Sequence, residues 1–128
     1  MIIGTGVDLV VIDRIAKVWQ RHESSFEQRI LHPEEQIVFS QVNSPMKVRW
    51  LAKRWAVKEA AAKALGTGFR QGVTFAQFIY GHDTLGKPLL RLTGTAETLA
   101  QIKLISEWHV SLSDERDHVV AMVIAERA

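Results

Sequence analysis

The alternation of apolar and polar positions predicts a strand at the start of the chain. Residues 1–12, MIIGTGVDLVVI, are rich in β-branched and apolar side chains, which favours a strand buried on most of its surface. Period-two spacing gives this strand one face with Ile3, Thr5, Val7, Leu9 and Val11 and another with Gly4, Gly6, Asp8 and Val10. Asp8 therefore shares its face with two residues that lack side chains.

Helical spacing predicts a run of helices after this strand. Residues 13–22 form the first helix, and residues 24–31 and 32–41 form two shorter ones. The clearest helix begins at a cap on Ser44 and ends at Gly66, which supplies the usual C-terminal stop.

The second half of the chain changes to strand patterns. A turn-rich connector, GHDTLGK, separates two apolar segments and predicts a hairpin. The expected elements are strands over residues 74–80, 88–92, 107–113 and 118–126 and a helix over residues 93–103. This order predicts an α+β fold, with a largely antiparallel sheet and helices packed on it, in a single domain over residues 1–128.

Composition agrees with one domain and narrows the chemistry. The chain has 128 residues, of which 47% are hydrophobic and none is cysteine. Any metal must therefore be held by oxygen or by histidine nitrogen. No apolar run approaches the ~20 residues of a membrane span and no signal-peptide pattern begins the chain, so we expect a cytoplasmic protein without membrane contact. The formal charge of +2 and the pI of about 9.2 indicate a mildly basic chain whose charged partners would meet local patches.

One carboxylate of the long helix stands where an apolar residue is expected. At helical spacing, Glu59 lies near the middle of the apolar stripe, with Lys63 about 40° from it. Three arrangements would compensate a carboxylate there. Glu59 could pair with Lys63 within the helix, both groups could lie at a partly open rim, or Glu59 could bind a metal ion for which Asp8 supplies the other oxygen ligand. The pattern leaves these three open.

Two further features each have a structural and a functional interpretation. The GTG segment at residues 66–68 is either a helix C-cap followed by a turn, or a loop whose backbone amides approach a phosphate. His109 on a strand is more often a structural histidine than a catalytic one.

Three segments taken together resemble a known family. In this order, GTGVDLVVIDRI, RWAVKEAAAKALGTG and WHVSLSDE are similar to the holo-acyl-carrier-protein synthases, the small bacterial 4'-phosphopantetheinyl transferases, and the resemblance extends over essentially the whole chain. It implies the 4'-phosphopantetheinyl transferase-like fold. It also implies transfer of 4'-phosphopantetheine from coenzyme A to a serine of apo acyl carrier protein, with release of adenosine 3',5'-bisphosphate, in support of fatty acid biosynthesis.

The resemblance also implies roles for particular residues. Asp8, Glu59 and Lys63 would be catalytic, with Asp8 and Glu59 as ligands of Mg²⁺ on the coenzyme A diphosphate. Coenzyme A would be bordered by Lys63, Gly66, Thr67, Gly68, Lys87, Pro88 and His109. Many relatives have histidine where this chain has Asp114, so we assign that position no catalytic role.

The implied partners are a carrier protein and other copies of the chain. Arg14 and Arg21 lie seven residues apart on one helix face, where with Val18 and Phe26 they would dock an acidic carrier. Small family members form homotrimers with coenzyme A between protomers. The main alternative is a non-catalytic module that binds nucleotide or carrier. A nucleic-acid-binding domain is disfavoured because the basic residues interleave with acids.

Overall fold

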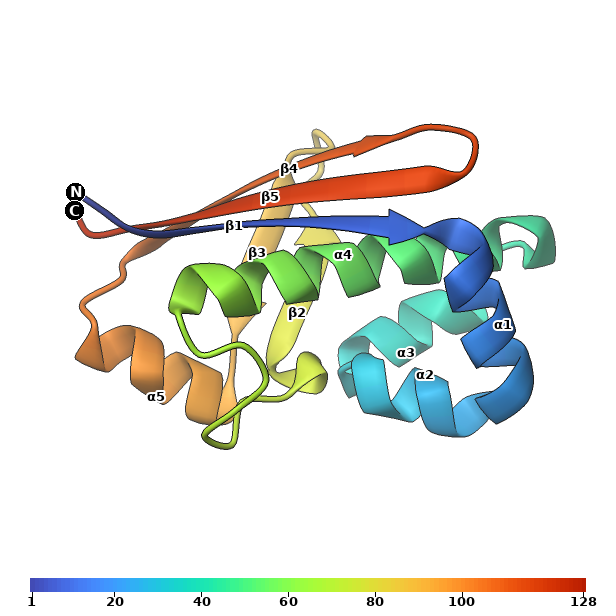
Figure 1. The fold of residues 1–128 in the computed structure, drawn as a ribbon, viewed down its shortest axis with the longest axis horizontal. Coiled ribbons are helices and arrows are strands. Elements are labelled where there is room, and N and C mark those ends of the chain that lie inside the picture. Colours follow the sequence, from blue (N-terminus) through green and yellow to red (C-terminus); the bar gives the residue numbers. More distant parts are fainter.

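The fold is a three-stranded antiparallel sheet covered on one face by helices, with a separate two-stranded hairpin. The computed structural model describes residues 1–128, and the predicted α+β class with antiparallel sheet is confirmed (Figure 1). The elements are β1 (Ile2–Val11), α1 (Ile12–His22), α2 (Ser24–Ile30), α3 (Pro33–Ser40), α4 (Lys47–Leu65), β2 (Phe78–His82), β3 (Pro88–Leu92), α5 (Gly94–Ile102), β4 (Glu107–Asp114) and β5 (His118–Glu126). None of the helices combines the length and hydropathy of a membrane span.

Two predicted boundaries are wrong by a few residues. The expected long helix starts with a separate 3-10 turn over Ser44–Met46, and α4 itself begins at Lys47. The expected strand over residues 74–80 is a 3-10 turn over Phe75–Gln77 followed by β2.

The chain forms two separate sheets. The three-stranded sheet has the order β1-β5-β4, with both neighbouring pairs antiparallel, and β2 and β3 form the predicted hairpin. In Figure 1, α4 runs along the length of β1, with α1, α2 and α3 at one end and α5 at the other. Strands β1 and β4 are thus the two edges of the larger sheet.

The glycine-bearing face of β1 allows the strand to lie directly on α4. A Cβ atom on Gly4 would stand 1.9 Å from the Ala64 carbonyl oxygen, and one on Gly6 would stand 1.9 Å from that of Ala60. The predicted division of β1 into two faces is therefore correct, but its predicted burial on most of its surface is wrong. The other face is open, with Val7 56% and Leu9 66% exposed.

Helix α4 is buried on nearly all sides because the sheet covers one side and the remaining helices and β2 cover the others. Two of its cations are buried as well: Lys58 is fully buried, and Arg54 is 6% exposed. The Lys58 ammonium donates to Glu35 Oε1 and to the Ile30 carbonyl, both at 2.5 Å. Glu35 also accepts from the Tyr80 amide at 3.0 Å, so one buried ion pair joins α2, α3, α4 and β2.

Candidate active site

Asp8 and Glu59 come together, as the sequence predicted, in a cleft between β1, α1 and α4. The cleft has a volume of about 280 Å³, and its lining includes both carboxylates with Arg14 and Trp55. Burial raises the pKa of Asp8, and the charge of Lys63 opposes this rise. Burial also raises the pKa of Glu59, and the neighbouring charge of Asp8 raises it further. Two carboxyls that repel each other in this way are suited to share a cation.

Lys63 belongs to the same site but does not pair with Glu59. Its ammonium donates to the Val7 carbonyl at 2.8 Å and lies 3.4 Å from Asp8 Oδ1. No Glu59–Lys63 ion pair is formed, so the intrahelical alternative is wrong. The second Asp8 oxygen, Oδ2, is buried and has no hydrogen-bond partner. An orphaned carboxylate oxygen beside a second carboxylate fits the oxygen donor set that Mg²⁺ prefers.

The GTG segment at residues 66–68 is a helix C-cap in this structure. Gly66 adopts a left-handed conformation with φ of 92°, and the amides of Gly66 and Gly68 both donate to the Ala62 carbonyl. The Lys103 ammonium donates to the last carbonyl of α4, that of Leu65, at 2.5 Å. Two of the three GTG amides are therefore already used within the chain.

A second cleft lies at the opposite edge of the sheet. It has a volume of about 710 Å³, and Arg49, Lys53 and Arg54 of α4 line it. We call it the cationic cleft because Asp114 is the single carboxylate in its lining. Asp114 Oδ2 lies 2.7 Å from Arg49, and Asp114 Oδ1 lies 3.9 Å from Lys53. Asp114, to which the sequence assigned no catalytic role, therefore holds two cations at the wall of this cleft.

Arg54 is the cation of this cleft that forms no ion pair, although the charge of the buried Glu35 acts on it. Its guanidinium carbon lies 3.8 Å from the centre of the Trp50 ring and 5.0 Å from that of Tyr80, so two aromatic rings hold it. Its Nε atom is buried without a hydrogen-bond partner. Burial lowers the pKa of Arg54 to about 10, which still leaves it charged. Sequence analysis missed these cations, although Arg49 and Lys53 stand four residues apart and share a helix face.

Lys87, Pro88 and His109 also meet, at a cleft of about 390 Å³ between β3 and β4. This cleft shares Pro88 and Val110 with the cationic cleft, so the two form a continuous surface. Three of the predicted coenzyme A residues therefore lie beside the cationic cleft and not beside Asp8.

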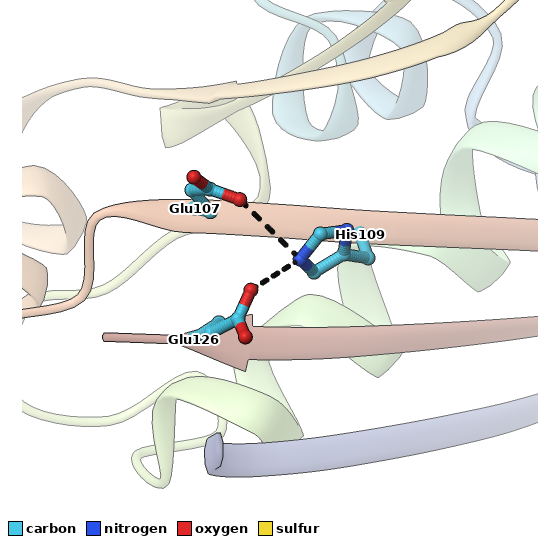
Figure 2. A group of neighbouring side chains, drawn as sticks. All are labelled: Glu107, His109 and Glu126. Atoms are coloured by element: carbon cyan, nitrogen blue, oxygen red, sulfur yellow. Dashed lines mark hydrogen bonds and ion pairs between the residues drawn. The ribbon is translucent and has the colours of Figure 1, made fainter. Parts of the chain in front are cut away.

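His109 lies between two glutamates on the outer face of the sheet (Figure 2). Its Nε2 atom is 2.9 Å from Glu126 Oε1 and 3.7 Å from Glu107 Oε2. The hydrogen bond with His109 holds the pKa of Glu126 below its usual value. One imidazole nitrogen and two carboxylates within 4.8 Å of one another could accept a metal ion, but the hydrogen bond between His109 and Glu126 accounts for the same arrangement.

The predicted carrier-docking residues divide between surface and core. Arg14 and Val18 line the cleft of Asp8 and Glu59, and Arg21 is exposed further along α1. Phe26 is 4% exposed and stacks on Trp55 at 5.9 Å between ring centres. The inclusion of Phe26 in a docking surface is therefore wrong, because the packing of α2 against α4 buries it.

Known proteins match this chain over nearly its whole length. The family model of the 4'-phosphopantetheinyl transferase superfamily matches residues 4–123. The holo-[acyl-carrier-protein] synthase of Edwardsiella ictaluri is 53% identical over 125 residues, which covers 98% of each chain. The crystal structure of the Neisseria meningitidis synthase superimposes with a TM-score of 0.91 at 44% identity, over 99% of this chain and 100% of that one. The Bacillus anthracis synthase in complex with CoA (3',5'-ADP) gives a TM-score of 0.83 at 30% identity, over 100% and 99%. With the family model and these relatives covering almost every residue, the chain belongs to the 4'-phosphopantetheinyl transferase superfamily, among the holo-acyl-carrier-protein synthases that its sequence motifs predicted.

Proposed function

We propose that this protein transfers 4'-phosphopantetheine from coenzyme A to a serine of an apo acyl carrier protein and releases adenosine 3',5'-bisphosphate, as a step that supports fatty acid biosynthesis. The observation that carries the proposal is the meeting of Asp8 and Glu59 in one cleft beside Lys63, with an Asp8 oxygen that has no partner. The names of the relatives support a carrier protein as acceptor, and the coenzyme A in the Bacillus anthracis complex supports the donor.

Asp8 and Glu59 would together hold a Mg²⁺ ion, and Lys63 would face the diphosphate of coenzyme A from the rim. The ion, when bound, would neutralise charge on the diphosphate. Lys63 is 51% exposed along its side chain, so its ammonium can turn from Asp8 to a phosphate oxygen and offset the charge that develops on the leaving bisphosphate. Glu59 is suited to take the serine proton because burial and Asp8 raise its pKa.

The cationic cleft would receive the nucleotide end of coenzyme A. Coenzyme A carries a diphosphate and a 3'-phosphate. Since the diphosphate is assigned to Lys63 and the ion held by the carboxylates, the three cations of this cleft are suited to bind the 3'-phosphate. Trp50 and Tyr80 offer aromatic surface for the adenine. Lys87, Pro88 and His109, on the continuous surface beside it, would border the same nucleotide. Thr67 and its two neighbouring glycines would border the diphosphate next to Lys63.

The two clefts lie at opposite edges of the sheet, with α4 between them, so we infer that one site is assembled from two protomers. The open face of β1 and β5 carries the exposed apolar residues Val7, Leu9 and Met122. A contiguous apolar face of this kind is typical of an interface between subunits. A homotrimer would cover this face and bring the cationic cleft of one copy to the carboxylates of the next.

The acidic carrier would dock on α1 through Arg14, Val18 and Arg21. Arg14 and Val18 line the cleft of Asp8 and Glu59, so a carrier bound there delivers its serine to the carboxylates. Neither arginine has an ion-pair partner within the chain, so both charges are available to the carrier.

The test is the mass of an apo acyl carrier protein after incubation with this protein, coenzyme A and Mg²⁺. We expect a gain of one 4'-phosphopantetheinyl group, with release of adenosine 3',5'-bisphosphate. The gain should be abolished by replacing the acceptor serine of the carrier and reduced at least about 100-fold in rate by Asp8→Asn. Asp13→Asn, which changes an exposed carboxylate on α1, is the matched control. A folded wild-type protein that binds coenzyme A but leaves the carrier mass unchanged would establish the non-catalytic alternative.

A further inference from the structure

The cationic cleft contains one titratable group that the proposed transfer reaction does not use. His82 ends β2, pairs with Pro88 across the hairpin, and lines the cleft together with Tyr80. The Tyr80 hydroxyl lies 3.3 Å from His82 Nε2, and the two rings meet edge to face at 5.2 Å between centres. The imidazole is therefore held in place at the cleft wall while its side chain stays open to solvent.

We propose that His82 is a specificity-determining residue of the cationic cleft: it gains a proton when the 3'-phosphate of coenzyme A enters, and so couples the affinity for coenzyme A to pH. This inference rests on the proposed function, because it takes coenzyme A as the ligand of the cleft. It adds a residue and a proton that the transfer reaction itself does not require.

Burial and the neighbouring charges disfavour a proton on His82 while the cleft is empty. The partial burial of the exposed imidazole lowers the pKa of His82, and the nearby charges of Arg54 and Lys53 lower it further, while Asp83 opposes them. Arg49 also lines the cleft. Asp114, the one carboxylate of the lining, is engaged by Arg49 and Lys53. The charge of the buried Glu35 raises the pKa of Arg54, yet Arg54 still lowers that of His82.

A phosphate monoester reverses this balance when it enters the cleft. At neutral pH it carries nearly two negative charges, since its second pKa is about 6. These charges offset the repulsion from Arg54 and Lys53 and favour the protonated imidazole. The pKa of His82 therefore rises on binding, and binding takes up a proton wherever the pH lies between the free and the bound values.

Affinity for coenzyme A is greatest where His82 is protonated in the complex, and it falls as the pH rises through the bound-state pKa. A rise of about one pKa unit on binding changes the affinity by up to about tenfold. Below about pH 6 the phosphate itself becomes protonated and loses negative charge, which lowers the affinity for coenzyme A as the pH falls. The effect of His82 is therefore measured above about pH 6.

Isothermal titration calorimetry of coenzyme A in Mg²⁺-containing buffers of different ionisation enthalpy counts the protons taken up. Near pH 7 we expect uptake of a fraction of a proton per site in the wild type and almost none in His82→Asn. Between pH 6.5 and 8.5, wild-type affinity should fall several-fold more than that of His82→Asn. His118→Asn, a change at an exposed histidine outside the cleft, should keep the wild-type proton uptake.

Two further measurements separate this role from a structural one. His82→Lys fixes a positive charge in the cleft, so it should bind coenzyme A tightly and without this pH dependence, whereas a merely structural histidine would not be replaced by lysine. With dephospho-coenzyme A, which lacks the 3'-phosphate, wild type and His82→Asn should take up the same number of protons. Equal uptake by the two proteins with coenzyme A, or a difference that persists with dephospho-coenzyme A, overturns the proposal. The carrier-mass assay is independent, so failure of the transfer function is seen separately.

Discussion

At the scale of single residues, the carboxylate pair is unfavourable until it has a cation to share. Burial raises the pKa of both Asp8 and Glu59. A carboxyl whose pKa is raised by folding favours the native state most at low pH, and that contribution is lost as the pH rises through the raised value. Without divalent ions, the pair should therefore weaken the fold at neutral pH and weaken it less as the pH falls.

This yields a prediction for thermal unfolding in the presence of a chelator. Asp8→Asn should melt higher than wild type at pH 7.5, and the difference should shrink as the pH is lowered, because the carboxyls of the wild type then become protonated. Added Mg²⁺ should raise the melting temperature of the wild type and leave that of the variant nearly unchanged. A lower melting temperature for the chelated variant at pH 7.5 would mean that the Asp8–Lys63 pair is mainly structural.

Residue-scale features were predictable where periodicity alone places a side chain. Alternation put Asp8 on the glycine face of β1, and helical spacing put Glu59 on the apolar stripe of α4. The partner of Lys63 was not predictable in the same way. Its ammonium meets the Val7 carbonyl from 56 positions away in the chain, and only the packing of α4 on β1 creates that contact. The residue pattern left a metal ion held by both carboxylates as one of three alternatives, and the family resemblance favoured it.

At the scale of elements, α4 is buried on more sides than its apolar stripe indicated. Lys58 lies outside that stripe, yet it is fully buried because α2, α3 and β2 pack on the second side of the helix. A buried ion pair needs both partners, since removing one leaves an uncompensated charge.

Lys58→Met should therefore lower the free energy of unfolding by about 3–5 kcal/mol, because Glu35 then stays buried without its cation. Denaturant unfolding measures this loss. Lys17→Met, at an exposed ion pair on α1, should change it by less than about 1 kcal/mol. Similar small losses in both variants would show that Glu35 is compensated by its backbone donors alone.

Docking of the carrier on α1 can be tested separately from the binding of coenzyme A. Arg14→Glu should raise the KM for the acidic carrier about tenfold or more and leave the KM for coenzyme A nearly unchanged, since only the docking contact changes sign. Rising salt should weaken wild-type docking in the same assay. Arg29→Glu makes the same charge change on α2 and should have little effect on either constant. A carrier KM that is unaltered in Arg14→Glu would remove α1 from the docking surface.

At the scale of the whole molecule, contact with other copies of the chain was expected, but the face that would make it was not. The sequence predicted β1 to be buried on most of its surface, whereas α4 covers only the glycine face and the opposite face with Val7 and Leu9 is exposed. Which face a helix covers depends on contacts between distant segments, and period-two alternation does not specify it. The cationic cleft was missed for the same reason, because its lining comes from α3, α4, β2, β3 and β4.

Subunit mixing tests most directly whether the carboxylates of one protomer and the cationic cleft of the next form one active site. Asp8→Asn removes the first half-site, and the double variant Arg49→Glu/Lys53→Glu removes the second, so each protein alone should be nearly inactive. In a trimer that contains both, one of the three junctions joins two intact halves, and co-expression in equal amounts should restore about a quarter of wild-type carrier modification. Mixed trimers, isolated through two different tags, that remain as inactive as either parent would contradict this arrangement and place the whole site within one chain.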